Sequence, residues 1–156
     1  MYQCPFCLPK IKNKSFYCND YFFAIYNHAP IISGHVLIVP NIHFQKICEL
    51  PIIFSEQLFP FVQKIMKILN FAYNATDFDI SIQDGIFAGQ TVAHLHVHVI
   101  PRLKDDCLQQ TDWYYELHNQ EKKYVLDSML RPIIPEKEFL EITENLRKIG
   151  MEMVFF

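Results

Sequence analysis

The sequence predicts an α+β fold in a single domain. The chain has 156 residues, of which 51% are hydrophobic and 20% charged, a composition typical of a globular protein with a packed core. This length suffices for one core and is short for two, so we expect one domain over residues 1–156. Short apolar runs that resemble strands are segregated from two segments with helical periodicity, and this segregation indicates the α+β class.

Three segments have the features of β-strands. Residues 21–27 (YFFAIYN) and 35–40 (HVLIVP) are short apolar runs, separated by a turn-rich stretch that contains Pro30 and Gly34. We expect them to be adjacent strands. Residues 77–84 (DFDISIQD) alternate polar and apolar side chains, which favours a further strand.

The first predicted helix covers residues 55–73. Its apolar residues recur at intervals of three and four, which predicts one buried helix face: Leu58, Phe61, Ile65, Ile68 and Phe71. Ser55 is a candidate N-cap, although Pro60 leaves the true start of the helix open.

A second helix is predicted around residues 136–149. Pro135 precedes it, Gly150 lies just past its expected end, and its apolar residues form one stripe. Between the predicted sheet and this helix, residues 104–127 are polar and show no clean period. We expect a mobile surface loop there.

Charge and cysteine content limit the function classes. The formal net charge is −3, so no broad basic surface is expected and no nucleic-acid partner is predicted. The first ten residues lack the pattern of a signal peptide, and no apolar run is long enough to cross a membrane, which favours the cytosol. Five cysteines, an odd number, indicate reduced thiols rather than a disulfide framework.

Three histidines dominate residues 93–100. Apolar residues alternate with His94, His96 and His98, so in a strand the three imidazoles would share one face, about 6.6 Å apart. A half-exposed strand that happens to carry histidines, or an adventitious metal patch, would give the same pattern. A catalytic role for these histidines is the better interpretation, because near pH 7 histidine can be a nucleophile, a proton donor or a ligand.

A small-residue loop precedes the histidines. Gln83 and Asp84 lead into the sequence AGQT at residues 88–91. Backbone N–H groups in such a loop suit phosphate oxygens, although the same sequence also makes an ordinary turn. Beside three aligned histidines, we interpret the loop as half of a phosphate site.

The motif His94-Leu95-His96-Val97-His98-Val99-Ile100 resembles the signature of the histidine-triad superfamily, in which histidines alternate with apolar residues. Residues 81–102 (SIQDGIFAGQTVAHLHVHVIPR) look most like the fragile-histidine-triad branch, the dinucleoside polyphosphate hydrolases, and residues 33–40 (SGHVLIVP) support this. The similarity covers roughly residues 4–103. It implies a mainly antiparallel sheet of about five strands with two helices, and a homodimer.

The resemblance implies a role for each histidine and for nearby residues. His96 would attack the α-phosphorus and become nucleotidylated, with its other ring nitrogen held as a donor, for example to a backbone carbonyl. His98 would contact the bridging oxygen, and His94 would be a hydrogen-bond partner in a zinc-free site. Asn27 would hold the ribose hydroxyls. The phosphate charge would be stabilised by His98 and by a donor set from the loop: Gln83, Gly89, Gln90, Thr91 and Val92.

Three apolar residues are candidates for the walls around the base: Phe6, Ile25 and Leu37. Simple core packing explains each of them equally well. Tyr114 lies where related hydrolases carry a tyrosine. It could contact substrate or a partner, although exposed loop aromatics often do neither.

The implied activity is hydrolysis of dinucleoside polyphosphates such as diadenosine tri- or tetraphosphate. The third histidine separates the chain from the nucleotidyltransferase branch, where glutamine is usual. The sequence Ile100-Pro101-Arg102 after the triad differs from the Gly-rich segment of the phosphoramidase branch. Alternatives are a nucleoside phosphoramidase or adenylylsulfate hydrolase, and a nucleotide-binding regulator with slow turnover.

Cys4-Pro-Phe-Cys7 departs from the animal members of the fragile-histidine-triad branch and looks like the Cys-x-x-Cys of zinc-carrying relatives. By position, His43 and His94 would complete a Cys₂His₂ set, and the Zn²⁺ would be structural because protein fills all four places. A free thiol pair or a redox pair are the alternatives. His35 would be a hydrogen-bond partner in the active site, or a spare ligand if His43 points away.

Overall fold

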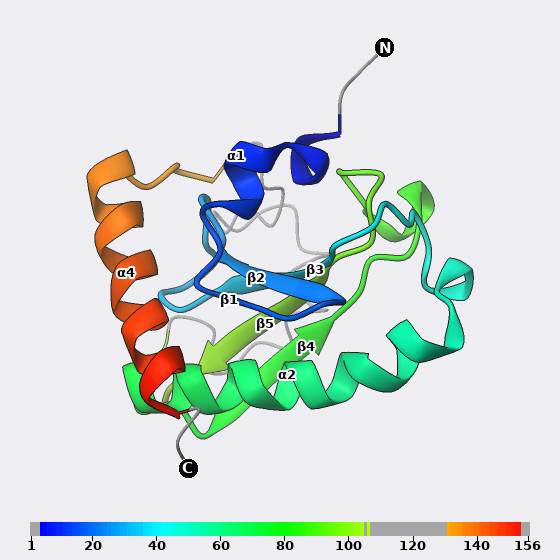
Figure 1. The fold of residues 1–156 in the computed structure, drawn as a ribbon. Helices are drawn as coiled ribbons and strands as arrows, with labels where there is room; N and C mark the ends of the chain where they lie inside the picture. Colours follow the sequence, from blue (N-terminus) through cyan, green and yellow to red (C-terminus); the bar gives the residue numbers. More distant parts are fainter. Residues whose placement is uncertain (1–3, 105, 107–130, 154–156) are drawn as a thin grey trace.

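The computed structural model describes residues 4–104, 106 and 131–153, and its centre is a five-stranded antiparallel sheet (Figure 1). Most of the predicted loop over residues 104–127, with Tyr114, lies outside the described residues. The strand order is β1-β2-β3-β5-β4, and every neighbouring pair is antiparallel. The strands are β1 (Tyr17–Cys18), β2 (Phe22–Tyr26), β3 (Val36–Pro40), β4 (Asp77–Ser81) and β5 (Val97–Arg102). The predicted α+β class and the five-stranded antiparallel sheet are confirmed.

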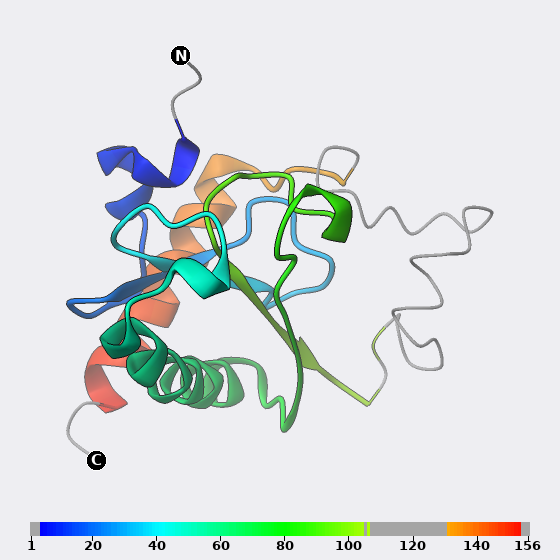
Figure 2. The same ribbon diagram turned by 90° about the vertical axis from the view of Figure 1, so that its right-hand side faces the viewer.

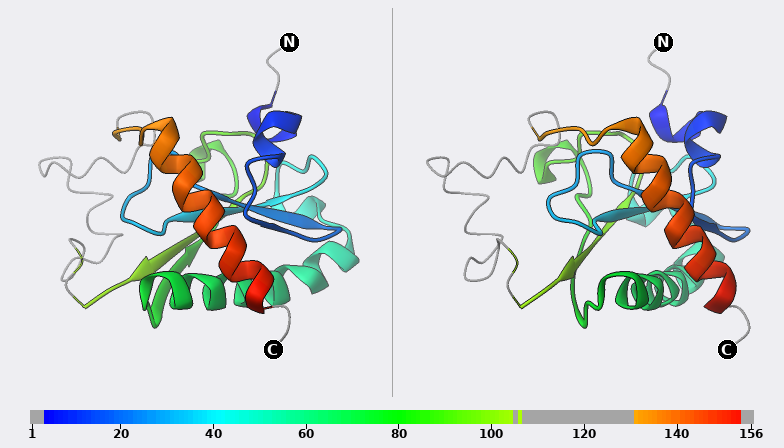
Figure 3. Two further views of the ribbon diagram at one scale, coloured as in Figure 1. Left: turned by 60° about the vertical axis from the view of Figure 1, so that its left-hand side comes forward. Right: turned by 90° about the vertical axis from the view of Figure 1, so that its left-hand side faces the viewer.

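Two long helices cover one side of the sheet. They are α2 (Ile52–Tyr73) and α4 (Glu136–Glu152), and Figure 3 shows α4 crossing the sheet to meet α2 near its own C-terminal end. The short helix α1 (Pro9–Lys12) lies on the opposite side, as Figure 2 shows. Three 3₁₀ turns complete the described elements: η1 (Pro5–Cys7), η2 (Ile47–Glu49) and η3 (Ile86–Ala88). Among the described helices, none combines the length and the apolar character needed to cross a membrane.

The central strands are buried on both faces, which explains their continuous apolar runs. In β2, Phe22, Ala24 and Tyr26 pack under α2 and α4, while Phe23 and Ile25 face the other way. The second face holds a smaller cluster that is completed by Phe6 of η1 and Ile11 of α1: Phe23, Ile25, Leu37 and Val39. The sheet therefore separates a large core from a smaller apolar surface beneath the N-terminal segment.

Both long helices differ in detail from their predictions. Helix α2 begins at Ile52, and the Ser55 N–H already donates to the carbonyl of Pro51, so the prediction of Ser55 as N-cap is wrong. Pro60 lies inside this helix. Phe71 is 68% exposed rather than buried, because it lies two residues after the buried Leu69 and so about 200° further round the helix.

Helix α4 continues through Gly150 instead of ending before it. A Cβ at Gly150 would lie 3.2 Å from both Ile68 Cδ1 and Tyr17 Cδ2. The glycine therefore allows α4 to approach α2 and β1 closely, and it does not terminate the helix as predicted.

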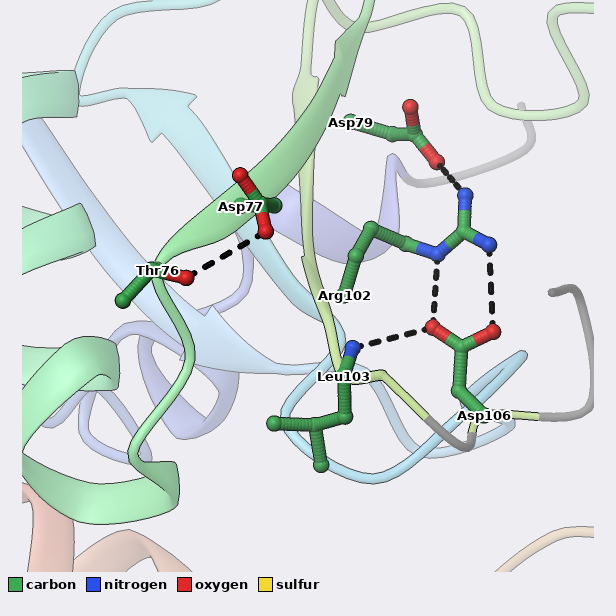
Figure 4. A network of polar contacts seen from close by, with 6 residues as sticks. All are labelled: Thr76, Asp77, Asp79, Arg102, Leu103 and Asp106. Atoms are coloured by element: carbon green, nitrogen blue, oxygen red, sulfur yellow. Dashed lines mark hydrogen bonds and ion pairs between the residues drawn. The ribbon is translucent and has the colours of Figure 1, made fainter.

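An ion-pair network closes the end of β5 (Figure 4). The Arg102 guanidinium donates to Asp79 Oδ2 of β4 at 2.6 Å and to both carboxylate oxygens of Asp106, at 2.8 and 3.1 Å. The Leu103 N–H donates to the same Asp106 carboxylate at 3.0 Å. These contacts, a two-point Arg–carboxylate pair among them, fix the point where the chain leaves the sheet.

Replacing Gly34 with alanine is expected to lower the free energy of unfolding by about 2–4 kcal/mol. Gly34 has φ +87°, and a Cβ there would lie 2.5 Å from Pro101 Cγ and 3.1 Å from the Tyr73 ring. Urea unfolding would measure the loss. Gly89→Ala is the matched control, since its φ is +88° but its Cβ would meet only Gln83 Cγ at 3.8 Å. Equal losses in the two variants would contradict a role for the close contact.

Candidate active site

A cavity of about 380 Å³ lies on the side of the sheet that the N-terminal segment covers. Its apolar wall comes from η1, α1 and the inner residues of β2 and β3: Phe6, Ile11, Ile25 and Leu37. Its polar wall includes Asn27, His96 and His98. The structure thus brings together the predicted nucleophile, the predicted ribose ligand and the three predicted base-wall residues.

His96 is oriented by the backbone of the preceding turn. Its Nδ1 donates to the carbonyl oxygen of His94 at 2.8 Å, so the second ring nitrogen, Nε2, is the one without a proton. Burial lowers the pKa of His96, which keeps the ring neutral. The prediction that a backbone carbonyl holds the other ring nitrogen is confirmed.

The protonation of His98 follows from a chain of hydrogen bonds. The Ile31 N–H donates to His35 Nδ1 at 3.2 Å, so His35 carries its proton on Nε2. That proton is donated to His98 Nδ1 at 2.9 Å, and His98 in turn must carry its own proton on Nε2. Burial, reinforced by the electrostatic interaction with the neighbouring His96 ring, lowers the pKa of His98 to about 3. His98 is therefore a neutral ring that can donate a hydrogen bond from Nε2.

Asn27 and His35 are buried together behind His98. The Asn27 Oδ1 accepts from the Ala29 N–H at 3.0 Å, and its Nδ2 lies 3.4 Å from both ring nitrogens of His35. His35 is fully buried, and burial holds its pKa well below the usual range. Of the two predicted alternatives for His35, the structure supports a hydrogen-bond partner in the active site, with His98 as the residue that it contacts.

Cys4, Cys7, His43 and His94 form the predicted metal-binding group. Their ligand atoms all lie within 4.8 Å of one another. Cys4 Sγ is 3.4 Å and Cys7 Sγ 3.6 Å from His94 Nδ1, and Cys7 Sγ is 3.3 Å from His43 Nδ1. A tetrahedral zinc with ordinary Zn–S and Zn–N bonds would place sulfur and nitrogen about 3.6 Å apart. The four residues therefore fit a metal ion, and His43 points toward the group.

The ring of His94 has the orientation and the protonation state of a metal ligand. Its Nε2 donates to the carbonyl oxygen of Pro40 at 3.2 Å, which leaves the Nδ1 lone pair facing the two sulfurs. Burial, with the neighbouring His43, lowers the pKa of His94 to about 4, so the ring is neutral as a ligand must be. The four cysteines that the structure describes form no disulfide with one another.

The prediction that all three triad histidines share one strand face is wrong. Strand β5 begins at Val97, so only His98 belongs to it. The Asn41 N–H donates to the carbonyl oxygen of Tyr21, beside β2. Successive residues of a strand direct their backbone groups to opposite neighbours, so the backbone nitrogen of Pro40 faces β5. Proline has no N–H, so it cannot donate the next hydrogen bond between β3 and β5. The chain turns just before β5 and directs His94 toward the cysteines. The rings of His96 and His98 remain in the cavity, with their centroids 5.0 Å apart.

The predicted phosphate loop is only partly at the cavity. Thr91 and Val92 line it, whereas Gln83, Gly89 and Gln90 are not among its described lining residues. The amide of Gln90 is engaged elsewhere, since Nε2 donates to the Gln45 carbonyl at 3.0 Å and Oε1 accepts from the Gly85 N–H at 3.1 Å. In this structure Gln90 stabilises its own loop.

Several lining residues were missed by the sequence analysis. Lys14 and Glu136 form an ion pair of 2.6 Å at the cavity, and Arg131 reaches it from the segment that precedes α4. His28 is exposed and also borders the cavity. No periodic pattern or spacing marks any of these residues, so the sequence contained no signal for them.

The HIT domain family model matches residues 9–105. A bis(5'-nucleosyl)-tetraphosphatase (asymmetrical) of Schizosaccharomyces pombe is 36% identical over 111 residues, 71% of this chain and 61% of that protein. A bis(5'-adenosyl)-triphosphatase of Saccharomyces cerevisiae is 39% identical over 60% of this chain and 46% of its own length. A bis(5'-adenosyl)-triphosphatase of Dictyostelium discoideum is 29% identical over 81% of this chain and 89% of its length. The chain thus spans 61% and 46% of the two yeast relatives.

Solved structures share the fold. A hypothetical histidine triad nucleotide-binding protein from Sulfolobus tokodaii has a TM-score of 0.72 at 26% identity, covering 96% of this chain and 93% of that one. The Plasmodium falciparum diadenosine triphosphate hydrolase has a TM-score of 0.69 at 25% identity, covering 90% and 78%. A zinc-bound histidine triad family protein from Mycobacterium smegmatis has the same fold, with a TM-score of 0.69 at 23% identity, covering 97% and 96%. With the HIT domain model matching more than half of its length, the chain belongs to the HIT (histidine triad) family.

Proposed function

We propose that the chain is a nucleotide hydrolase that cleaves a dinucleoside polyphosphate at the α-phosphorus through a nucleotidyl intermediate on His96. The observation that carries this proposal is the pair of neutral rings in one cavity: His96 with an unprotonated Nε2, and His98 with a proton on Nε2. A nucleophile beside a hydrogen-bond donor is what substitution at phosphorus requires.

The first step transfers the nucleotidyl group. A bond forms from His96 Nε2 to the α-phosphorus while the bond from phosphorus to the bridging oxygen breaks, and the electron pair leaves on that oxygen. The Nε2–H of His98 donates to the departing oxygen, which carries the developing charge. Water then attacks the same phosphorus and loses a proton to solvent, the electron pair of the phosphorus–nitrogen bond returns to His96 Nε2, and a nucleoside monophosphate is released.

The cavity suits a nucleoside. The apolar wall that includes Phe6, Ile25 and Leu37 offers a surface for the base, and we assign the ribose to Asn27 beside it. The relatives named as bis(5'-nucleosyl)-tetraphosphatase and bis(5'-adenosyl)-triphosphatase support dinucleoside polyphosphates as the substrate class. Thr91 and Val92 are the loop residues that line the cavity, and we assign them to the phosphates.

We further propose that Cys4, Cys7, His43 and His94 hold a structural Zn²⁺. Protein would fill all four positions, so the ion would supply folding energy rather than a reactive water. Phe6 lies between the two cysteines, and its ring is 5.8 Å from the His94 ring and 5.4 Å from the His96 ring. The metal would thus fix one wall of the cavity.

A turnover screen tests the proposed function. The substrates would be diadenosine triphosphate, diadenosine tetraphosphate, adenosine phosphoramidate and adenylylsulfate, with release of AMP measured. We expect the dinucleotides to have the highest kcat/KM. Preference for the phosphoramidate or adenylylsulfate would favour those activities instead, and turnover far slower than ligand dissociation would favour a nucleotide-binding regulator.

Two further expectations stay predictions of the sequence. One is the homodimer that the resemblance implies. The other is a cytosolic location.

A further inference from the structure

We propose that a second cavity, adjacent to the first, binds the nucleoside of the leaving group, with the base stacked on Phe87. The inference rests on the proposed function, because it concerns the half of the dinucleotide that is not transferred to His96. The second cavity has a volume of about 670 Å³ and lies between two loops, with lining residues at positions 45–46 and within 84–93. Thr91 lines both cavities.

The shared residue Thr91 connects the second cavity to the phosphate end of the first. In the proposed function, the base of the transferred nucleotide lies against the apolar wall, and its phosphate lies at His96 and Thr91. A cavity of about 380 Å³ suits one nucleotide, whereas the substrate carries two. A phosphate chain that continues past Thr91 brings the second nucleoside to the neighbouring cavity.

The loop between Gly85 and Gly89 presents an apolar surface at the second cavity. These glycines have φ +108° and +88°, values that other residues rarely adopt, and they bracket the 3₁₀ turn η3. Within that turn, Ile86 is 78% exposed and Phe87 is fully exposed. Exposed apolar side chains beside a cavity are typical of a binding surface. A phenylalanine ring offers a flat face on which any base can stack.

Polar groups for the rest of a nucleotide lie at the same cavity. The Lys46 side chain extends over Gly85, where an added Cβ would lie 3.9 Å from Lys46 Cε. Among the described residues, the Lys46 ammonium forms no ion pair, so it can bind phosphate oxygens. Asp84 Oδ1 accepts from the Ile47 N–H at 3.2 Å, and its second carboxylate oxygen can accept from a ribose hydroxyl.

The amide of Gln90 joins the two loops that form the second cavity. Its Nε2 donates to the Gln45 carbonyl oxygen at 3.0 Å, and its Oε1 accepts from the Gly85 N–H at 3.1 Å. These contacts hold the loops together, so the cavity is preformed. A preformed site loses little conformational freedom when a ligand binds.

Three ligands separate the proposed role from its alternatives. AMP has only the transferred nucleotide, ATP adds further phosphates, and diadenosine tetraphosphate adds the second nucleoside. If Phe87 only stabilises its loop, its loss should change the affinity for all three ligands alike. If Phe87 contacts a second copy of the chain, its loss should change the oligomeric state. A role in binding the second base lowers the affinity for the dinucleotide alone.

The experiment measures dissociation constants for the three ligands in a His96→Ala background, where turnover is removed. We expect Phe87→Ser to weaken binding of diadenosine tetraphosphate about tenfold or more, and binding of AMP and ATP less than about twofold. Phe87→Trp should keep the affinity, because it retains an aromatic face. Lys46→Gln should weaken ATP and diadenosine tetraphosphate about threefold or more and leave AMP unchanged.

The matched control is Phe71→Ser on α2. Phe71 is also an exposed phenylalanine and is not among the described lining residues of either cavity, so all three dissociation constants should stay unchanged. Equal weakening of the three ligands by Phe87→Ser, or no weakening, would overturn the proposal. A changed molecular mass in light scattering with unchanged affinity for the dinucleotide would instead assign Phe87 to a contact between copies. Absence of turnover with an intact selective effect on the dinucleotide would refute the hydrolase function alone.

Discussion

Replacing His96 with alanine or asparagine should lower kcat/KM for diadenosine tetraphosphate by at least about a thousandfold while nucleotide binding persists. His96 is the residue assigned to bond formation with phosphorus, whereas its neighbours orient, coordinate or donate hydrogen bonds. Asparagine is the sharper substitution, since its amide can replace the bond from His96 Nδ1 to the His94 carbonyl without supplying a nucleophile. Steady-state kinetics and equilibrium titration would measure the two quantities.

The intermediate gives a direct readout of the same mechanism. Quenching without acid during turnover, followed by intact-mass measurement, should show one nucleotidyl group on the wild type, and peptide mapping should place it on His96. His98→Ala should turn over more slowly and still form this adduct, because His98 acts on the departing oxygen. An active His96→Ala enzyme, or an adduct on another residue, would contradict the mechanism.

Removing the proposed zinc site should have the largest effect on stability. Protein purified without added metal should contain about one zinc per chain, and Cys4→Ser with Cys7→Ser should abolish it and lower the free energy of unfolding by roughly 3–5 kcal/mol. Elemental analysis and denaturant unfolding would measure the two effects. The loss should be large because the metal would join η1 to His43 and to His94, segments far apart in the sequence.

The two other cysteines that the structure describes supply the control for the zinc prediction. Cys18 and Cys48 are exposed thiols outside the metal-binding group, so replacing both with serine should leave the zinc content and the stability unchanged. A wild-type protein that is metal-free and fully stable would refute the metal site. Loss of zinc should also reduce activity, because Phe6, between the cysteines, contacts the ring of His96. His96→Ala should keep its zinc.

Local patterns in the sequence determined the main elements and the chemical groups. The apolar runs placed β2 and β3, because burial on both faces leaves a continuous apolar run. The spacing of apolar residues placed both long helices, because burial of one helix face imposes a period of 3.6 residues. The triad motif, together with Cys4-x-x-Cys7, indicated the residues that we propose to react with phosphorus and to bind a metal. These features lie within short stretches, so they can be read before the chain is folded.

Only the tertiary structure decided how those groups face one another. The triad divides between two sites because Pro40, on a neighbouring strand, ends the ladder and accepts a hydrogen bond from His94. The proton of His98 is fixed through His35, 63 positions away, and Arg131 reaches the cavity through Ala29, 102 positions away. A single arginine or histidine has no periodicity, and its partner is chosen by how strands and loops pack. Such contacts depend on distance in space, which the order of residues along the chain does not contain.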